Sequence, residues 1–277
     1  MIHKKTILVE TELVDDHWTT GTVAAIDQAG FLASCLQSEI HLLSGSGLPP
    51  ETSEESPALL ERLHKETASA LEKVGVGMTS AFIHEASSDC PAGQPAPLSF
   101  VFLSLPDLID DTQADHRSQV LAECRNDLWL AAPQAFDPEI PCVAVYDDLT
   151  SNGELTLRAA ISVAQNLQAR LLVVHAGSAE SAGKPKEELE SILYSRLFGT
   201  DFRTLDQGTR LFIQNGTVDD VLNQAVGEFE SSLVVVSWPD GPINADTLPN
   251  FMTALNQQHC SLLLVRTPET VESLSEV

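Results

Sequence analysis

Two carboxylates and a histidine follow apolar runs in the second half of the chain. Asp147 and Asp148 come directly after the run 142–146, and His175 closes the run 171–174. At the carboxyl end of a strand, paired carboxylates can bind a metal ion or a ribose, and a histidine can act as a base. The structural alternatives are a solvated, helix-capping loop for the carboxylates and a hydrogen-bonded structural role for the histidine. We expect the structural alternative for both.

No other residues have the spacing of a catalytic centre. Ser44 and Ser178 lack the G-x-S-x-G turn that exposes a nucleophile. The histidines show neither H-x-x-x-H nor H-E-x-x-H spacing, and the cysteines form no C-x-x-C pair. The sequence therefore predicts a protein that is not an enzyme, binds no metal and keeps its thiols reduced. The five cysteines are Cys35, Cys90, Cys124, Cys142 and Cys260.

Acidic residues dominate the charge of the chain. Forty Asp and Glu against fifteen Lys and Arg give a net charge of −25, which repels the phosphates of nucleic acids and of anionic membranes. The excess can serve solubility in a salty cytoplasm or form an acidic face for a basic protein partner. No apolar run approaches the roughly 20 residues that span a bilayer. We expect a cytoplasmic protein without direct membrane insertion, since 1–7 lacks a signal-peptide core.

One pattern of residues occurs twice. The segment 39–45, Glu-Ile-His-Leu-Leu-Ser-Gly, returns at 170–177 as Arg-Leu-Leu-Val-Val-His-Ala-Gly. The segment 102–107 returns at 235–240, where both copies end in Ser-x-Pro-Asp. The two pairs keep almost the same separation along the chain, and that separation suits a compact domain better than a solenoid repeat. The sequence therefore predicts two similar domains.

Short apolar runs alternate with segments of helical periodicity in both halves. Continuous apolar strands between amphipathic helices are typical of a parallel sheet covered on both faces. In the first half we expect strands at 6–10, 40–43, 80–84, 98–105 and 128–132, helices around 26–36, 60–74 and 114–126, and a Pro-rich non-helical stretch at 90–97. In the second half we expect strands at 142–146, 171–174, 210–214, 233–236 and 262–265, with helices around 157–167, 186–197, 217–225 and 248–257.

A polar, Pro-containing linker near 134–140 separates the halves. We expect two α/β domains, 1–135 and 139–268, followed by a polar tail at 269–277. Each is predicted to be a doubly wound, parallel-sheet, Rossmann-like domain.

The second half resembles a universal stress protein domain along nearly its whole length. Val143–Asp147 is similar to the family's Asp-ended first strand, and Leu171–His175 to its second strand. Gly216–Ala225 is similar to the glycine-led third helix, and His259–Val265 to the final strand. The first half matches only in outline, as a diverged copy. Tandem members of this family place their domains side by side, which implies an internal pseudo-dimer here, and a homodimer of the whole chain is the default expectation for further assembly.

The resemblance also implies where an adenine nucleotide such as ATP or AMP would bind. In nucleotide-binding members the Asp that ends the first strand contacts adenosine, and a glycine-rich loop after the fourth strand holds the phosphates. The corresponding residues here are Asp147, Val174, His175, Ser237 and Gly241.

The phosphate loop of this chain departs from the family pattern G-x-x-G, nine residues, G-S/T. In the segment 237–247 only Gly241 remains, while Asp240 and Asp246 add negative charge. The corresponding segment 104–111 of the first half has no glycine. Trp238 can serve either packing or ligand stacking. These departures predict weak phosphate binding and no tightly held cofactor.

Three functions stay open at the level of sequence. The leading hypothesis is a non-enzymatic universal-stress-like protein with degenerate phosphate loops that acts in stress response or regulation through contacts with an unknown protein partner. The second is an adenine-nucleotide sensor that uses the second domain. The third is a regulatory partner of a membrane transporter, which the acidic surface and the behaviour of some family members suggest.

Overall fold

The computed structural model divides the chain into two compact units, Met1–Phe136 and Asp137–Val277. Each unit is described below by itself. The division falls within the segment 134–140. The structure describes residues 6–11, 13–14, 17–44, 56–73, 75, 77–80, 100–105, 126–133, 142–177, 185–199, 208–238 and 247–267.

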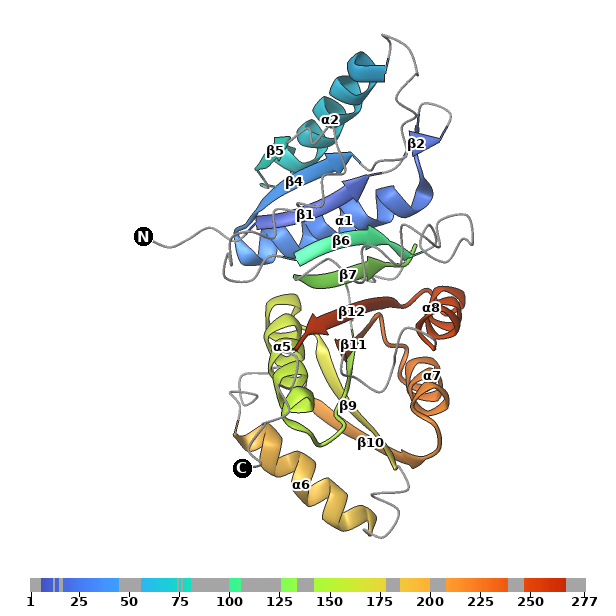
Figure 1. Ribbon diagram of the computed structural model, residues 1–277. Coiled ribbons are helices and arrows are strands. Elements are labelled where there is room, and N and C mark those ends of the chain that lie inside the picture. The colour runs from blue at the N-terminus through green and yellow to red at the C-terminus, as the bar shows by residue number, and fades with distance from the viewer. Residues whose placement is uncertain are drawn as a thin grey trace, which may run out of the picture. The chain divides into compact units, whose positions relative to one another are not determined.

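Five of the described strands of the first unit lie parallel in the order β5-β4-β1-β6-β7 (Figure 1). Helix α1 packs on β1, β4, β6 and β7, and α2 packs on β5. A short antiparallel pair, β2 with β3, precedes α1. The elements are β1 (Thr6–Thr11), β2 (Leu13–Val14), β3 (His17–Trp18), α1 (Thr20–Leu36), β4 (Glu39–Ser44), α2 (Ser56–Lys73), β5 (Met78–Ser80), β6 (Phe100–Ser104) and β7 (Asp127–Ala131).

A buried tryptophan centres the core of the first unit. The ring of Trp129 stacks on Phe102 at 5.0 Å between centroids, and neither side chain is exposed to solvent. Its indole Nε1–H donates to Gln28 Oε1 at 2.9 Å, and Gln28 Nε2 donates to the carbonyl of Ala132 at 2.8 Å. Gln28 therefore ties α1 to the carboxyl end of β7.

The second unit has a parallel sheet in the order β10-β9-β8-β11-β12. Helix α5 lies on the opposite face of this sheet from α7 and α8 (Figure 1). All residues of β8 and β11 are buried, as expected for central strands covered on both faces, whereas the edge strand β10 is partly exposed. The elements are β8 (Cys142–Tyr146), α5 (Ser151–Leu167), β9 (Arg170–Gly177), α6 (Lys186–Phe198), β10 (Thr209–Asn215), α7 (Val218–Phe229), β11 (Leu233–Trp238), α8 (Leu248–Gln257) and β12 (Ser261–Arg266).

The two units share one strand order, in which the third, second, first, fourth and fifth strands follow one another across the sheet. The repeated segments fall on corresponding strands, β4 with β9 and β6 with β11. The prediction of two doubly wound parallel α/β units is thereby confirmed. The predicted helix at 114–126, the Pro-rich stretch at 90–97, most of the strand predicted at 80–84 and the tail 269–277 lie outside the described residues.

Side-chain caps mark the starts of two helices in the second unit, α5 and α7. The Thr150 hydroxyl accepts a hydrogen bond from the Gly153 N–H at the start of α5, and the Thr217 hydroxyl accepts one from the Asp220 N–H at the start of α7. At its carboxyl end, α5 stops at Gln168, which adopts the left-handed conformation at φ 53°. Short polar residues therefore begin these helices where the sequence places them.

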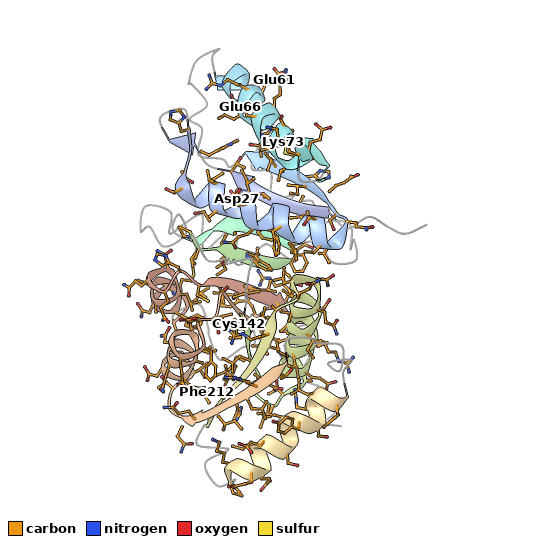
Figure 2. The ribbon with its side chains drawn as sticks, turned by 180° about the vertical axis from the view of Figure 1, so that it is seen from behind. Asp27, Glu61, Glu66, Lys73, Cys142 and Phe212 are labelled. Carbon is orange, nitrogen blue, oxygen red and sulfur yellow. The ribbon has the colours of Figure 1, made fainter. Side chains whose placement is uncertain are left out.

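Three cysteines in the described part of the chain are free thiols. Cys142 on β8, labelled in Figure 2, and Cys260 before β12 are buried, and Cys35 on α1 is half-buried. Burial raises the pKa of both Cys142 and Cys260, so neither is a thiolate near neutral pH. Cys90 and Cys124 lie outside the described residues. Within the described ranges, no helix is long and apolar enough to cross a membrane.

Candidate functional site

The carboxyl ends of β8 and β9 bring together three of the residues predicted from the sequence. Tyr146 pairs with Val174 in the parallel register, and the Asp147 N–H donates to the Val174 carbonyl at 3.0 Å. Asp147 and His175 are the next residues along these two strands, so they lie side by side. Asp147 and Val174 have no exposed surface, and His175 is 3% exposed. The site therefore lies at the edge of the sheet where α/β proteins bind ligands.

The turn after β8 is held by its own carboxylates. Asp147 Oδ1 accepts a hydrogen bond from the Leu149 N–H at 2.8 Å, and Asp148 Oδ1 accepts one from the Thr150 N–H at 2.9 Å. Leu149 adopts the left-handed conformation at φ 66°, which is strained for a bulky residue. The two carboxylates therefore stabilise a turn that the backbone alone disfavours.

Gly153 allows this turn to lie close against the first turn of α5. A Cβ atom at position 153 would lie 2.6 Å from Asp147 Oδ1 and still closer to Asp148 Oδ1. Real side chains do not tolerate such contacts, so the close packing depends on glycine. Sequence reasoning missed Gly153, although a glycine in a first helical turn soon after two aspartates is a usable signal.

Arg196 in the last turn of α6 also faces Asp147. Its Nε lies 2.9 Å from Asp147 Oδ2, and its side chain is 17% exposed. The Nε–H is not aligned for a hydrogen bond to that oxygen, so the contact is an ion pair by proximity. Another guanidinium nitrogen donates to the Thr150 carbonyl. Arg196 thus joins α6 to the turn after β8.

The expectation that Asp147 lies in a solvated loop is wrong. Residues from β9, α5 and α6 surround the turn, so its carboxylate is fully buried. Burial raises the pKa of Asp147, while the Arg196 guanidinium and the Leu149 N–H oppose that rise. The neighbouring hydroxyl of Tyr146 has its pKa raised to about 12 by burial and by the two carboxylates. The structure therefore contains a buried, partly compensated carboxylate at the predicted position.

His175 is held by the main chain of the same turn. Its Nδ1 lies 2.7 Å from the Asp147 carbonyl, which fixes Nδ1 as the protonated nitrogen. The ring stacks parallel to Tyr146 with centroids 6.4 Å apart. Its Nε2 is buried and has no hydrogen-bond partner among the described residues. The histidine therefore presents one unsatisfied nitrogen inside the unit, and no carboxylate orients it as the base of a catalytic triad in the described structure.

The end of β11 carries the remaining predicted residues. Ser237 is 3% exposed and pairs with Val265 of β12. The ring of Trp238 lies 6.0 Å from the guanidinium carbon of Arg266, a cation–π distance, so this tryptophan packs against its own unit. Gly241 lies outside the described residues, as do Asp240 and Asp246. Weak phosphate binding by the loop after β11 therefore stays a prediction.

The first unit does not repeat this site. The strand pairs β1–β4 and β8–β9 start in the same register, Thr6 with Glu39 and Cys142 with Arg170, so the pair that corresponds to Asp147 and His175 is Thr11 and Ser44. The position of Asp147 is thus taken by a buried threonine, and the position of His175 by a serine. Among the described residues of both units, no group of His, Cys, Asp and Glu has the arrangement of a metal site.

These features define an α/β protein with the fold of the universal stress proteins, built from two units of that type. A universal stress protein from Archaeoglobus fulgidus DSM 4304 superposes with a TM-score of 0.59 at 11% identity, over 94% of this chain and 98% of that one. A functionally unknown protein from Pseudomonas aeruginosa PAO1 superposes with a TM-score of 0.63 at 16% identity, over 95% of this chain and 92% of that one. No family model and no curated protein matches the sequence. At these identities the likeness shows the fold.

Proposed function

We propose that this chain is a non-enzymatic regulatory protein of the universal stress type, which acts in the cytoplasm through contacts with a protein partner. The observation that supports this proposal most is the state of Asp147. The carboxylate that would contact adenosine in nucleotide-binding relatives is fully buried and lies 2.9 Å from Arg196. A ligand finds no free carboxylate there, so the resting chain lacks the first contact that a nucleotide needs.

Electrostatics favours a basic protein partner. The chain carries 40 acidic and 15 basic residues, so its field attracts basic surfaces and repels the phosphates of nucleotides and nucleic acids. The shared strand order is also compatible with an internal pseudo-dimer of the two units. In this proposal the function depends on contacts with the protein partner and not on chemistry at a cofactor.

Native mass spectrometry of freshly purified full-length chain tests the proposal. We expect the mass of the chain, as a monomer or a homodimer, without a stoichiometric small molecule. An ATP hydrolysis assay on the same sample is expected to match a buffer control. Stoichiometric ATP together with hydrolysis above the control would overturn the proposal.

A second candidate is an adenine-nucleotide sensor that uses the second unit. Asp147 and His175 lie side by side at adjacent strand ends, and His175 Nε2 is buried without a partner among the described residues. Buried polar atoms normally have partners, so a ligand group could complete this one. Thermal-shift titration with ATP, ADP and AMP separates the candidates, because a ligand at one hundred times its Kd stabilises the native state by about 2.7 kcal/mol. An unchanged melting temperature at millimolar nucleotide excludes the sensor.

A further inference from the structure

Arg196 has the position of an internal ligand in the candidate site. It is the residue of α6 that reaches both Asp147 Oδ2 and the Thr150 carbonyl. The other carboxylate oxygen of Asp147 already accepts the Leu149 N–H at 2.8 Å. Both oxygens of the buried carboxylate are therefore engaged by groups of the chain itself.

We propose that Arg196 is the residue that sets the affinity of this site, because it occupies Asp147 and must be displaced before a nucleoside can bind there. This inference rests on the second candidate function, a nucleoside site at Asp147 and His175. The ligand class that fits is one with hydroxyl or amino donors, since such groups can donate to Asp147 Oδ2, which accepts no hydrogen bond among the described residues.

The two partners differ in how easily they can move. Asp147 has no exposed surface and is held by the turn, whereas 17% of the Arg196 side chain is exposed. The Nε–H of Arg196 is not aligned with Asp147 Oδ2, so the ion pair lacks the linear hydrogen bond that would strengthen it. The side chain of Arg196 can therefore move toward solvent while the carboxylate stays in place.

The helix that carries Arg196 buries one face and exposes large side chains on another. Leu189, Leu193 and Leu197 are buried, whereas Tyr194 and Phe198 are 45% and 58% exposed. The arginine lies in the last turn, next to buried Leu197 and three residues before the C-cap residue Gly199. A change of its rotamer requires no movement of the leucine contacts. The displacement of Arg196 is thus local to one side chain.

The size of the effect follows from the population of the displaced state. A ligand that binds only when Arg196 has moved has its apparent affinity reduced by the fraction of molecules in that state. If about one molecule in ten to one in a hundred is open, removing the guanidinium lowers the Kd about tenfold to hundredfold. Arg196 thus acts as the affinity-determining residue of the site.

Calorimetric titration of the full chain with AMP and with adenosine tests this inference. We compare wild type with Arg196→Met, which keeps the aliphatic stem, and with Arg196→Lys, which keeps a charge but cannot reach both acceptors. Arg158→Met is the control, because Arg158 makes an ion pair with Glu154 on the surface of the neighbouring helix α5. Far-UV circular dichroism and urea unfolding establish which variants are folded.

We expect Arg196→Met to bind at least one of the two ligands about ten times more tightly than wild type or more. Arg196→Lys is expected to show a smaller gain, and Arg158→Met none. Arg196→Lys is the milder substitution, so its binding affinity tests the inference if Arg196→Met does not fold. A folded Arg196 variant that binds no better than wild type overturns the inference.

The outcomes also separate this inference from the functions proposed above. If wild type and folded variants all fail to bind, both the displacement and the nucleoside site are wrong, while the protein-contact function stands. If wild type binds tightly and the variants bind equally well, the sensor stands and the role of Arg196 is refuted. Weaker binding by Arg196→Met would show that the arginine contacts the ligand, which also refutes displacement.

Discussion

Replacing Gly153 by alanine should destabilise the second unit, although alanine normally favours a helix. Gly153 lies in the first turn of α5, where a Cβ atom would lie 2.6 Å from Asp147 Oδ1 and closer still to Asp148 Oδ1. Ordinary contact begins near 3.4 Å. Both carboxylates must therefore retreat, the first by about 0.8 Å, and their hydrogen bonds to the Leu149 and Thr150 N–H groups weaken.

The magnitude follows from two opposing terms. Alanine gains about 1 kcal/mol over glycine in a helix. A hydrogen bond to a charged acceptor contributes about 1.5–3 kcal/mol, so partial loss of two of them costs about 2–4 kcal/mol. We expect a net loss of about 1–3 kcal/mol, or roughly 3–10 °C in melting temperature. Urea and thermal unfolding followed by circular dichroism measure it.

Gly227→Ala supplies the matched control. Gly227 lies inside α7, where a Cβ atom would meet only Gln258 Oε1 at 3.5 Å, an ordinary contact. The same substitution should therefore stabilise the protein by up to about 1 kcal/mol. If Gly153→Ala stabilises as Gly227→Ala does, the argument that glycine is required for close packing of the two carboxylates is refuted.

Three further changes test other parts of the fold. Gln28→Leu should cost about 1–3 kcal/mol in unfolding free energy, because the buried Trp129 N–H loses its acceptor. Thr217→Ala should cost about 1 kcal/mol, since α7 loses its N-cap. Burial lowers the pKa of His64 below 6.5, so the unfolded chain takes up a proton first and stability falls as pH drops through 6.5. Unfolding of His64→Leu should depend less on pH over that range; an equal pH dependence contradicts this.

The sequence predicted the sheet elements well because central parallel strands are buried on both faces. Such strands must be continuous apolar runs, and those at 142–146 and 233–236 appear as β8 and β11. The adjacency of Asp147 and His175 was also predictable, because parallel strands end at one edge of a sheet. The local pattern of the sequence therefore predicts where a residue lies along its strand.

The surroundings of the carboxylate were not readable in this way. Arg196 reaches Asp147 from the last turn of α6, and no local periodicity indicates which polar side chain of a helix points back toward the sheet. The expected solvation of Asp147 failed for the same reason: a polar pair after a strand looks exposed until the packing of α6 is known. Contacts between elements distant in sequence decide burial, and burial decides the chemistry of the site.

Comparison of the two units indicates that Asp147 is not required by the fold. The first unit builds the same strand order with buried Thr11 at the corresponding position and Ser44 beside it. The second unit instead buries a carboxylate completely, which carries a desolvation cost that Arg196 only partly offsets, as the raised pKa of Asp147 shows. Asp147 stabilises its own turn through Leu149, but an equivalent sheet does without this carboxylate, so its desolvation cost is compatible with the second candidate function, a binding site. The asymmetry therefore directs functional experiments to the second unit.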